Sequence, residues 1–228
     1  MLRAIFFDAG NTLVFPNLER TLEPLHKRGL HPSREQLHGA ERAAKHKLDA
    51  GELRTQSQSV DYNYWHTYYS QLLDSMNISN DDLLGALIKA SRQSGSWDQV
   101  VPGTRDVLES LRAKYRLAVI SNSDGGISNL LHRCGIGECF ECITDSRHAG
   151  CEKPDAKIFR SALGQLGVAP EESMYVGDVY SVDYIGAHGA GMQAILFDVS
   201  GTYLDRPLPR VASLQELAAT VAEINLSE

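Results

Sequence analysis

Polar and acidic side chains follow three short apolar runs of this sequence, each at the point where the run ends. The runs cover residues 2–7, 117–120 and 174–176, and the polar residues after them are Asp8 and Thr12, Ser121 and Asn122, and Asp178 and Asp183. Short apolar runs that stop in turn-forming residues are typical of buried strands. The carboxyl ends of parallel strands share one edge of a sheet, so we expect these side chains to meet there. Lys153, in a loop before a predicted helix, is placed to reach the same edge.

Residues of these types share a specific chemistry. Two or three carboxylates hold a hard divalent cation such as Mg²⁺. A hydroxyl, backbone N–H groups and a lysine ammonium bind a phosphate or a carboxylate. A carboxylate that faces a metal-neutralised phosphoryl group can attack it and form an aspartyl-phosphate. Taken singly, each residue also fits a turn, a helix cap or an exposed loop, so the functional interpretation depends on their joint placement.

Strands and helices alternate along the second part of the chain. Helices are predicted near residues 104–111, 127–132, 157–166 and 183–190, strands near 117–120, 141–144, 174–176 and 194–197, and a last helix after Ser213. Together with the first strand, this alternation predicts an α/β fold, a doubly wound, Rossmann-like parallel sheet with helices on both faces.

A stretch with helical patterns only interrupts this alternation, which predicts a core of residues 1–16 and 97–228 and an inserted four-helix domain of residues 17–96. The four helices are expected near residues 18–27, 33–51, 62–73 and 80–88. The first contains Pro24 and is expected to be kinked or to start late. At the start of the second, the Ser33 hydroxyl and the Gln36 amide can cap each other's backbone donors.

Composition narrows the class of protein. The chain has 228 residues, 43% of them hydrophobic and 22% charged, and a formal net charge of −7, which is ordinary for a globular protein. The acidic balance argues against a nucleic acid or an anionic membrane bound through bulk charge. No apolar run of about 18 residues and no signal-peptide pattern is present. The four cysteines, which include the C-x2-C pair Cys139 and Cys142, indicate reduced thiols rather than a disulfide scaffold or a zinc site. We therefore expect a cytoplasmic protein with no nucleic-acid or membrane partner.

Four motifs, in order along the chain, make the sequence similar to the haloacid dehalogenase-like hydrolase superfamily. They are Asp8-Ala9-Gly10-Asn11-Thr12 for D-x-D-x-T, Ser121 at the end of an apolar strand, Lys153-Pro154, and Gly177-Asp178 with Asp183 for G-D-x-x-x-x-D. The similarity covers nearly the whole chain. It implies the phosphatase-like branch of the family, in which an α-helical cap inserted after the first motif closes over the active site and selects the substrate.

The resemblance also implies a role for each motif residue. Asp8 is the expected nucleophile and an Mg²⁺ ligand, with the Gly10 carbonyl and Asp178 as further ligands. Asp183 is expected to bind the metal through water or to orient its ligands. At the phosphate site, Thr12 holds the Asp8 loop in shape. Ser121, the Asn122 amide and Lys153 bind the non-reacting phosphate oxygens, and Lys153 counts with Asp8 as catalytic.

Gly10 departs from the family pattern, because family phosphatases carry there a second aspartate that protonates the leaving group and then activates water. General acid–base catalysis is typically worth about 10²–10⁴-fold in rate. Four outcomes stay open: a phosphatase with another acid or with activated substrates, a 2-haloacid dehalogenase, a phosphonate-cleaving enzyme with a cap lysine, and a catalytically weak binding protein. The lysines considered for the third outcome are Lys27, Lys45 and Lys47.

Asp178 favours phosphorus over carbon–halogen chemistry, because an added carboxylate beside the nucleophile would repel the carboxylate of a haloacid. The sequence therefore predicts a magnesium-dependent phosphohydrolase that acts on a small phosphorylated metabolite through an aspartyl-phosphate. The physiological substrate is not encoded in these motifs. The insert aromatics fit either a core or a substrate pocket, and an apolar face of the insert can support a homodimer; the aromatics are Tyr62, Tyr64, Trp65 and Tyr69.

Overall fold

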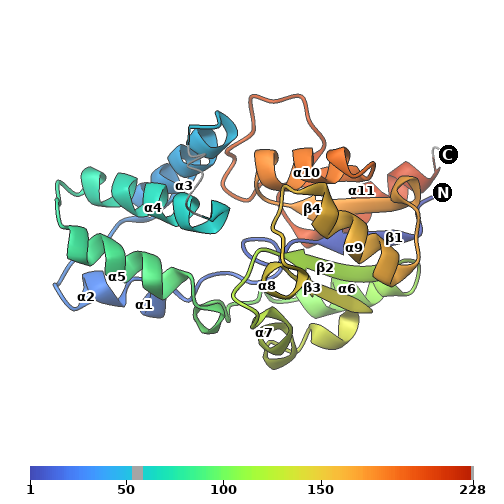
Figure 1. The fold of residues 1–228 in the computed structure, drawn as a ribbon, viewed down its shortest axis with the longest axis horizontal. Helices are drawn as coiled ribbons and strands as arrows, with labels where there is room; N and C mark the ends of the chain where they lie inside the picture. Colours follow the sequence, from blue (N-terminus) through green and yellow to red (C-terminus); the bar gives the residue numbers. More distant parts are fainter. Residues whose placement is uncertain (53–58, 227–228) are drawn as a thin grey trace. The chain divides into compact units, whose positions relative to one another are not determined.

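The computed structural model describes residues 1–52 and 59–226, and its central element is a six-stranded sheet in which every paired strand is parallel. The strand order is β3-β2-β1-β4-β5-β6 (Figure 1). The strands are β1 (Ala4–Phe7), β2 (Arg116–Ser121), β3 (Cys142–Asp145), β4 (Ser173–Gly177), β5 (Gln193–Phe197) and β6 (Arg210–Val211). The predicted α/β fold with a parallel sheet is confirmed, and the two-residue β6 is an addition that no periodicity indicated.

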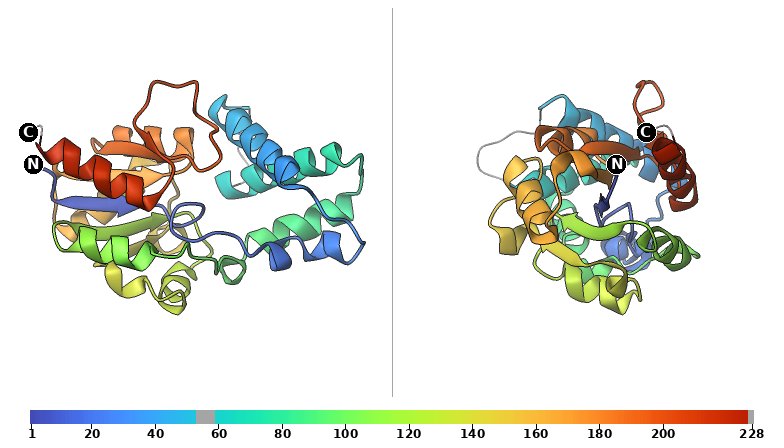
Figure 2. Two further views of the ribbon diagram at one scale, coloured as in Figure 1. Left: turned by 180° about the vertical axis from the view of Figure 1, so that it is seen from behind. Right: turned by 90° about the vertical axis from the view of Figure 1, so that its right-hand side faces the viewer.

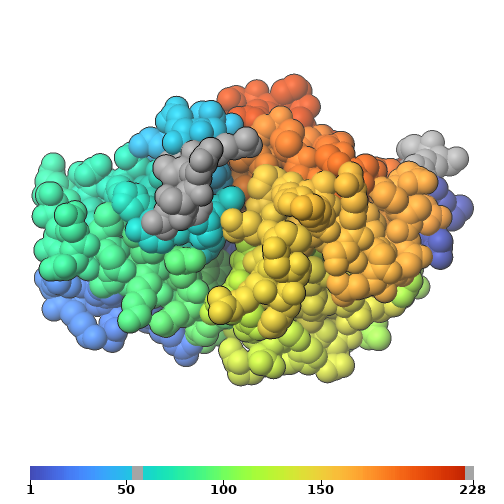
Figure 3. All heavy atoms as spheres, in the orientation of Figure 1, coloured from blue at the N-terminus to red at the C-terminus, as the bar shows by residue number. Residues whose placement is uncertain are grey.

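Helices cover both faces of this sheet, as the prediction required. The helices of this part of the chain are α6 (Thr104–Arg112), α7 (Ile127–Arg133), α8 (Ser146–Ala149), α9 (Ala156–Leu166), α10 (Ile185–Gly189) and α11 (Leu214–Leu226). Helices α9 and α10 lie on one face, and α6 and α11 lie on the other (Figure 2). In the space-filling view, the atoms of α9 and its neighbours cover the first of these faces (Figure 3).

Alternate residues of the strands build the core beneath α9 and α10. Phe6 pairs in register with Ala118 on one side and with Tyr175 on the other, and all three are fully buried. They pack with Ile158 and Phe159 of α9 in one hydrophobic cluster. Since side chains alternate between the faces of a strand, Tyr175 points toward α9, whereas its neighbours in β4 point to the opposite face.

The register also brings the ends of the central strands to one edge. Phe7, the last residue of β1, pairs with Val119 and with Val176. The next residue, Asp8, still donates its backbone N–H to the carbonyl of Val176 at 2.8 Å. The polar residues that follow β1, β2 and β4 therefore begin at the same level of the sheet.

The chain divides into two compact units, residues Met1–Phe15 with Asp98–Glu228 and residues Pro16–Trp97. The second unit is helical in its described residues. Its helices are α1 (Leu18–Thr21), α2 (Glu23–His26), α3 (Arg34–Asp49), α4 (Val60–Ser75) and α5 (Asp81–Ser91), followed by a 3₁₀ turn, η1 (Ser94–Ser96). Helix α4 packs against both α3 and α5.

One predicted helix of this unit is corrected by the structure. The expected first helix is two short helices that meet at Leu22, and Pro24 lies in the first turn of α2. Proline fits there because a backbone N–H in the first turn of a helix has no intrahelical acceptor to lose. Another feature of the unit is confirmed: Ser33 and Gln36 form the capping box of α3. The structure also shows that the Asn80 side chain caps α5.

Within the described ranges, no helix combines the length and the apolar character that a bilayer span requires. All four cysteines are free thiols.

Candidate functional site

Asp8 stands at the exit of β1, at the start of a tight loop. The carbonyl of Ala9 accepts hydrogen bonds from the backbone N–H groups of Leu13 and Val14, both at 2.9 Å, which folds residues 9–14 into a compact turn. Asn11 takes a left-handed conformation in this turn, with φ of 53°, which asparagine tolerates better than most residues. The loop holds the Asp8 carboxylate at the sheet edge, where it is 8% exposed.

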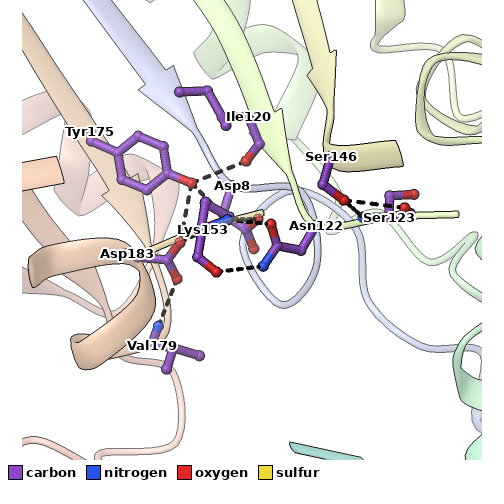
Figure 4. Close-up of polar contacts among 9 residues, drawn as sticks. All are labelled: Asp8, Ile120, Asn122, Ser123, Ser146, Lys153, Tyr175, Val179 and Asp183. Atoms are coloured by element: carbon purple, nitrogen blue, oxygen red, sulfur yellow. Dashed lines mark hydrogen bonds and ion pairs between the residues drawn. The ribbon is translucent and has the colours of Figure 1, made fainter. Parts of the chain in front are cut away.

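Lys153 is the centre of the polar cluster. Its Nζ donates to Asp8 Oδ1 at 2.5 Å, to Asp183 Oδ1 at 2.8 Å and to the Tyr175 hydroxyl at 2.8 Å (Figure 4). The lysine is 2% exposed, so these contacts replace water around its charge. The expectation that Lys153 reaches the carboxyl edge of the sheet thus matches its position.

Asn122 fixes the backbone from which Lys153 projects. Its Oδ1 accepts the Lys153 backbone N–H at 2.8 Å, and its Nδ2 donates to the Lys153 carbonyl at 3.0 Å. Both ends of the side-chain amide are therefore used within the protein (Figure 4). A contact from Asn122 to a phosphate could come from its backbone N–H or from the second N–H of Nδ2.

Asp183 joins the lysine to the loop that follows β4. Its Oδ1 receives Lys153 and the Tyr175 hydroxyl, the latter at 3.2 Å, and its Oδ2 accepts the Val179 backbone N–H at 2.9 Å. Gly177 leaves room for this side chain, because a Cβ at Gly177 would stand 2.5 Å from the Asp183 carboxyl carbon. The close approach explains physically why glycine occupies the position before Asp178.

Three buried carboxylates gather at this edge. Asp8, Asp178 and Asp183 each offer an oxygen, and these oxygens lie within 4.8 Å of one another. Carboxylate oxygens are the protein ligands that Mg²⁺ prefers, and a site that leaves room for water suits its octahedral coordination. The donor set therefore fits the predicted metal.

The charges of the cluster shift the ionisation of its members. Burial raises the pKa of Asp8 to about 7; the Lys153 ammonium opposes this rise, and the charges of Asp183 and Asp178 add to it. Burial alone would lower the pKa of Lys153, but the charges of Asp183 and Asp8 outweigh burial and raise it, so the lysine stays an ammonium. With all groups ionised, three carboxylates face one ammonium, and the cluster has a net charge of −2. A divalent cation would neutralise it.

The remaining predicted residues lie in the same segments. Thr12 is 1% exposed in the loop after β1, and its hydroxyl makes no hydrogen bond to any described residue. Ser121 is the last residue of β2, 4% exposed, and pairs in register with Asp145 of β3. Gly10 is two residues beyond Asp8 and forms a bridge with Val14.

Tyr175 is the member of the cluster that sequence reasoning missed. Its position in an apolar strand indicated only a core residue. The available signal was its hydroxyl at an inward-facing position two residues before Gly177, since a buried phenol needs a hydrogen-bond partner. In the structure the hydroxyl lies 3.1 Å from the Ile120 carbonyl as well as close to Lys153 and Asp183.

Fold and cluster together define an α/β domain with an acid–lysine site at the carboxyl edge of its parallel sheet. The family described as haloacid dehalogenase-like hydrolase matches residues 2–191. The chain belongs to this family.

Two relatives illustrate the family at the level of sequence. The chain is 33% identical over 138 residues to haloacid dehalogenase-like hydrolase domain-containing protein 3 of Xenopus laevis, which covers 58% of this chain and 56% of that protein. It is 41% identical over 110 residues to the glyceraldehyde 3-phosphate phosphatase of Methanothermobacter thermautotrophicus, which covers 46% of this chain and 47% of that one. These matches span about half the length of each relative.

Solved structures agree on the fold. The HAD-hydrolase YfnB of Bacillus subtilis, whose structure is bound to magnesium, superposes with a TM-score of 0.69 at 17% identity, covering 96% of this chain and 98% of that one. A 2-haloacid dehalogenase of Pseudomonas syringae superposes with a TM-score of 0.60 at 23% identity, covering 98% and 99%. At these identities the likeness shows the fold alone.

Proposed function

We propose that this protein is a magnesium-dependent phosphohydrolase that acts on a small phosphorylated metabolite through an aspartyl-phosphate on Asp8. The observation that carries the proposal is the buried cluster itself, with three carboxylate oxygens within 4.8 Å of one another and an ammonium 2.5 Å from the nucleophile. A sequence relative named as a phosphatase, 41% identical over 110 residues, supports the same reaction class.

In this mechanism the chain's own residues hold and attack the phosphoryl group. An Asp8 oxygen attacks phosphorus in line with the ester oxygen, the P–O bond to the leaving group breaks, and the leaving group takes its proton from water. Water then attacks the phosphorus of the aspartyl-phosphate, which releases phosphate and restores the Asp8 carboxylate. Ser121 and the backbone N–H of Asn122 are assigned to the non-reacting phosphoryl oxygens, where charge gathers in the transition state. Lys153 keeps the Asp8 carboxylate oriented and is also assigned to a phosphoryl oxygen. Thr12, whose buried hydroxyl makes no hydrogen bond to any described residue, is assigned to the same phosphate site.

Magnesium would be held by Asp8, the Gly10 carbonyl and Asp178, with Asp183 orienting the ligands, and it would supply positive charge that offsets the phosphoryl oxygens. Asp183 suits an orienting role, since both of its oxygens already accept hydrogen bonds from the protein.

Gly10 sets the expected substrate preference. Without an acid two residues after Asp8, the leaving group departs as an anion or takes a proton from solvent. The loss should be largest for alkoxide leaving groups, within the range of about 10²–10⁴-fold that a general acid supplies. We therefore propose that acyl or aryl phosphates are hydrolysed faster than alkyl phosphates.

Residues 16–97 form the helical unit that we assign as the cap. In the family that this chain resembles, a cap inserted after the first motif selects the substrate. The unit is helical in its described residues and follows directly after the loop that carries Asp8, and the residues that flank it, Phe15 and Gln99, pair with each other. The partner expected for this unit is the small phosphorylated substrate.

The test is turnover of para-nitrophenyl phosphate with magnesium and with chelator. We expect release of nitrophenol with magnesium, none with chelator, and none from Asp8→Asn. Asp205→Asn, an exposed loop substitution with the same change in charge, serves as the matched control and should keep full turnover. Acid quenching followed by mass spectrometry should detect the phosphorylated Asp8 peptide.

The alternatives give opposite results in the same experiment. The missing acid at Gly10 also suits a dehalogenase, since halide needs no proton. Release of halide from a 2-haloacid in chelator, with no phosphate ester turned over, would replace the proposed function by dehalogenation. No turnover of either phosphate esters or 2-haloacids would favour the third alternative, a binding protein.

A further inference from the structure

Tyr175 places a hydroxyl inside the hydrophobic layer under α9. The residue is fully buried, and its ring packs edge-on against Phe159, with centroids 5.2 Å apart and planes at 75°. Its hydroxyl lies 2.8 Å from Lys153 Nζ, 3.1 Å from the Ile120 carbonyl and 3.2 Å from Asp183 Oδ1. Phenylalanine would fill the same space without the cost of removing a hydroxyl from water. The hydroxyl therefore has a task that packing does not explain.

The hydrogen bonds of Lys153 show what this task is. An ammonium has three N–H donors. Nζ has three acceptors: Asp8 Oδ1 at 2.5 Å, Asp183 Oδ1 at 2.8 Å and the Tyr175 hydroxyl at 2.8 Å. Two of these acceptors are carboxylates, and the third is the neutral phenol. Without the phenol one N–H would point into the ring layer with no partner, and the ammonium would be free to rotate between the two acids.

The phenol can act as an acceptor because its own proton has another destination. Burial and the charges of Asp183 and Asp8 raise the pKa of Tyr175 well above its usual value, so the hydroxyl keeps its proton. That proton can be donated to the Ile120 carbonyl or to Asp183, while an oxygen lone pair receives Lys153. The chain of contacts runs from the backbone of β2 through Tyr175 to Lys153 and on to Asp8 (Figure 4).

We propose that Tyr175 is a positioning residue for the reaction: its hydroxyl takes the third N–H of Lys153 and holds the ammonium at the one place from which it orients the Asp8 carboxylate. Tyr175 does not touch the substrate and acts through Lys153. This inference rests on the proposed function for its kinetic consequence, whereas its structural content, a fixed Lys153 ammonium, is independent of the substrate.

The kinetic test is Tyr175→Phe, which removes one oxygen and keeps the ring on Phe159. Loss of a hydrogen bond to a charged group that orients the nucleophile is expected to lower kcat about tenfold. KM should stay within about twofold, because the substrate loses no contact. Phe159→Leu is the matched control, since it disturbs the same packing and spares the hydroxyl; it should lower the unfolding temperature and leave kcat within about twofold of wild type.

A merely structural role would give a different pattern. Tyr175→Phe would then lose activity only in proportion to its loss of folded protein, as Phe159→Leu would. An unchanged kcat in Tyr175→Phe, or equal losses of kcat in both variants, would overturn the inference.

The second test needs no turnover. Protein labelled with ¹⁵N-lysine is studied in chelator, and the Lys153 ammonium signal is assigned by its loss in Lys153→Met. An ammonium held by three acceptors and shielded from water exchanges its protons slowly, so wild type should show this signal and Tyr175→Phe should broaden or lose it. A wild type without the signal, or a Tyr175→Phe that keeps it unchanged, refutes the positioning role. If wild type shows the signal but hydrolyses no phosphate ester, the proposed function fails and the fixed ammonium stands.

Discussion

Loss of the Asp178 charge should stabilise the metal-free protein against unfolding. The cluster holds three carboxylates and one ammonium, and Lys153 forms ion pairs with Asp8 and Asp183. The charge of Asp178 is one of the causes that raise the pKa of Asp8. We therefore expect Asp178→Asn, which keeps the size of the side chain and removes its charge, to stabilise the metal-free fold.

The size of this effect follows from the distances. An oxygen of Asp178 lies within 4.8 Å of an oxygen of Asp8 and of one of Asp183. At an effective dielectric constant of about 20, two unit charges at that distance repel each other by about 3 kcal/mol. The two repulsions together come to about 6 kcal/mol. The loss of the attraction between Asp178 and Lys153, and of the other contacts of Asp178, offsets most of this and leaves a net gain of about 2 kcal/mol. For a chain of this length such a gain raises the unfolding temperature by about 4–8 °C.

The assay is thermal unfolding at pH 8, in chelator and in a magnesium titration. Wild type should gain stability with magnesium, by about 2.7 kcal/mol at a concentration one hundred times the Kd, because the ion binds only the folded state. Asp178→Asn should begin higher in chelator and gain little from magnesium. Asp205→Asn, with the same change in net charge at an exposed position, should follow wild type in both conditions. A less stable Asp178→Asn in chelator, or one that keeps the full response to magnesium, would refute the charge argument.

Three further expectations test other parts of the molecule. Because burial raises the pKa of Asp8 to about 7, magnesium must displace a proton from Asp8 when it binds below that pH. Calorimetry should show that the affinity for magnesium rises about tenfold per pH unit up to about pH 7 and stays level above it. An affinity for magnesium that does not change with pH would contradict this. Gly10→Asp should raise turnover of an alkyl phosphate at least about tenfold by restoring an acid, with a smaller gain for an aryl phosphate; a fall in both rates would mean that another group already has this role. Ser33→Ala removes the acceptor for the Gln36 N–H and should destabilise the helical unit by about 1 kcal/mol. Both tryptophans of the chain, Trp65 and Trp97, lie in that unit, so urea unfolding followed by tryptophan fluorescence reports on this unit. An unshifted midpoint would show that the Ser33 hydrogen bond does not stabilise the helix.

The sequence was informative where chemistry and periodicity coincide. Strands that lead into Asp8, Ser121 and Asp178 were predicted because an apolar run followed by small polar residues is typical of a buried strand that ends in a turn. Their convergence followed from the geometry of parallel sheets, which gathers carboxyl ends at one edge. Similarly, Ser33 and Gln36 were sufficient to locate a helix start, because a capping box is a local interaction.

Contacts between residues far apart in the sequence could not be predicted from periodicity and motifs. Periodicity placed Tyr175 on the inner face of a strand but could not show that Lys153, 22 positions earlier, would lie 2.8 Å from its hydroxyl. It also could not show that the Asn122 side chain is occupied by the Lys153 backbone. The division of the first helix at Leu22 depended on how a proline is accommodated, and a kink or a late start would have satisfied the same residues.

Because the cluster is negatively charged, a single variant, Asp178→Asn, can distinguish a phosphohydrolase from a dehalogenase. A dehalogenase would work without metal, so its anionic substrate would meet the full negative charge of Asp8, Asp178 and Asp183, and removal of one charge should help it. A magnesium-dependent phosphohydrolase needs that same charge to hold its ion. Asp178→Asn should therefore raise halide release if the protein is a dehalogenase and abolish phosphate release if it is the proposed phosphohydrolase. Halide release is assayed from a 2-haloacid in chelator and phosphate release from an aryl phosphate with magnesium, and the direction in which each rate changes decides between the two activities. Phosphate release that survives in Asp178→Asn would show that this residue does not hold the metal.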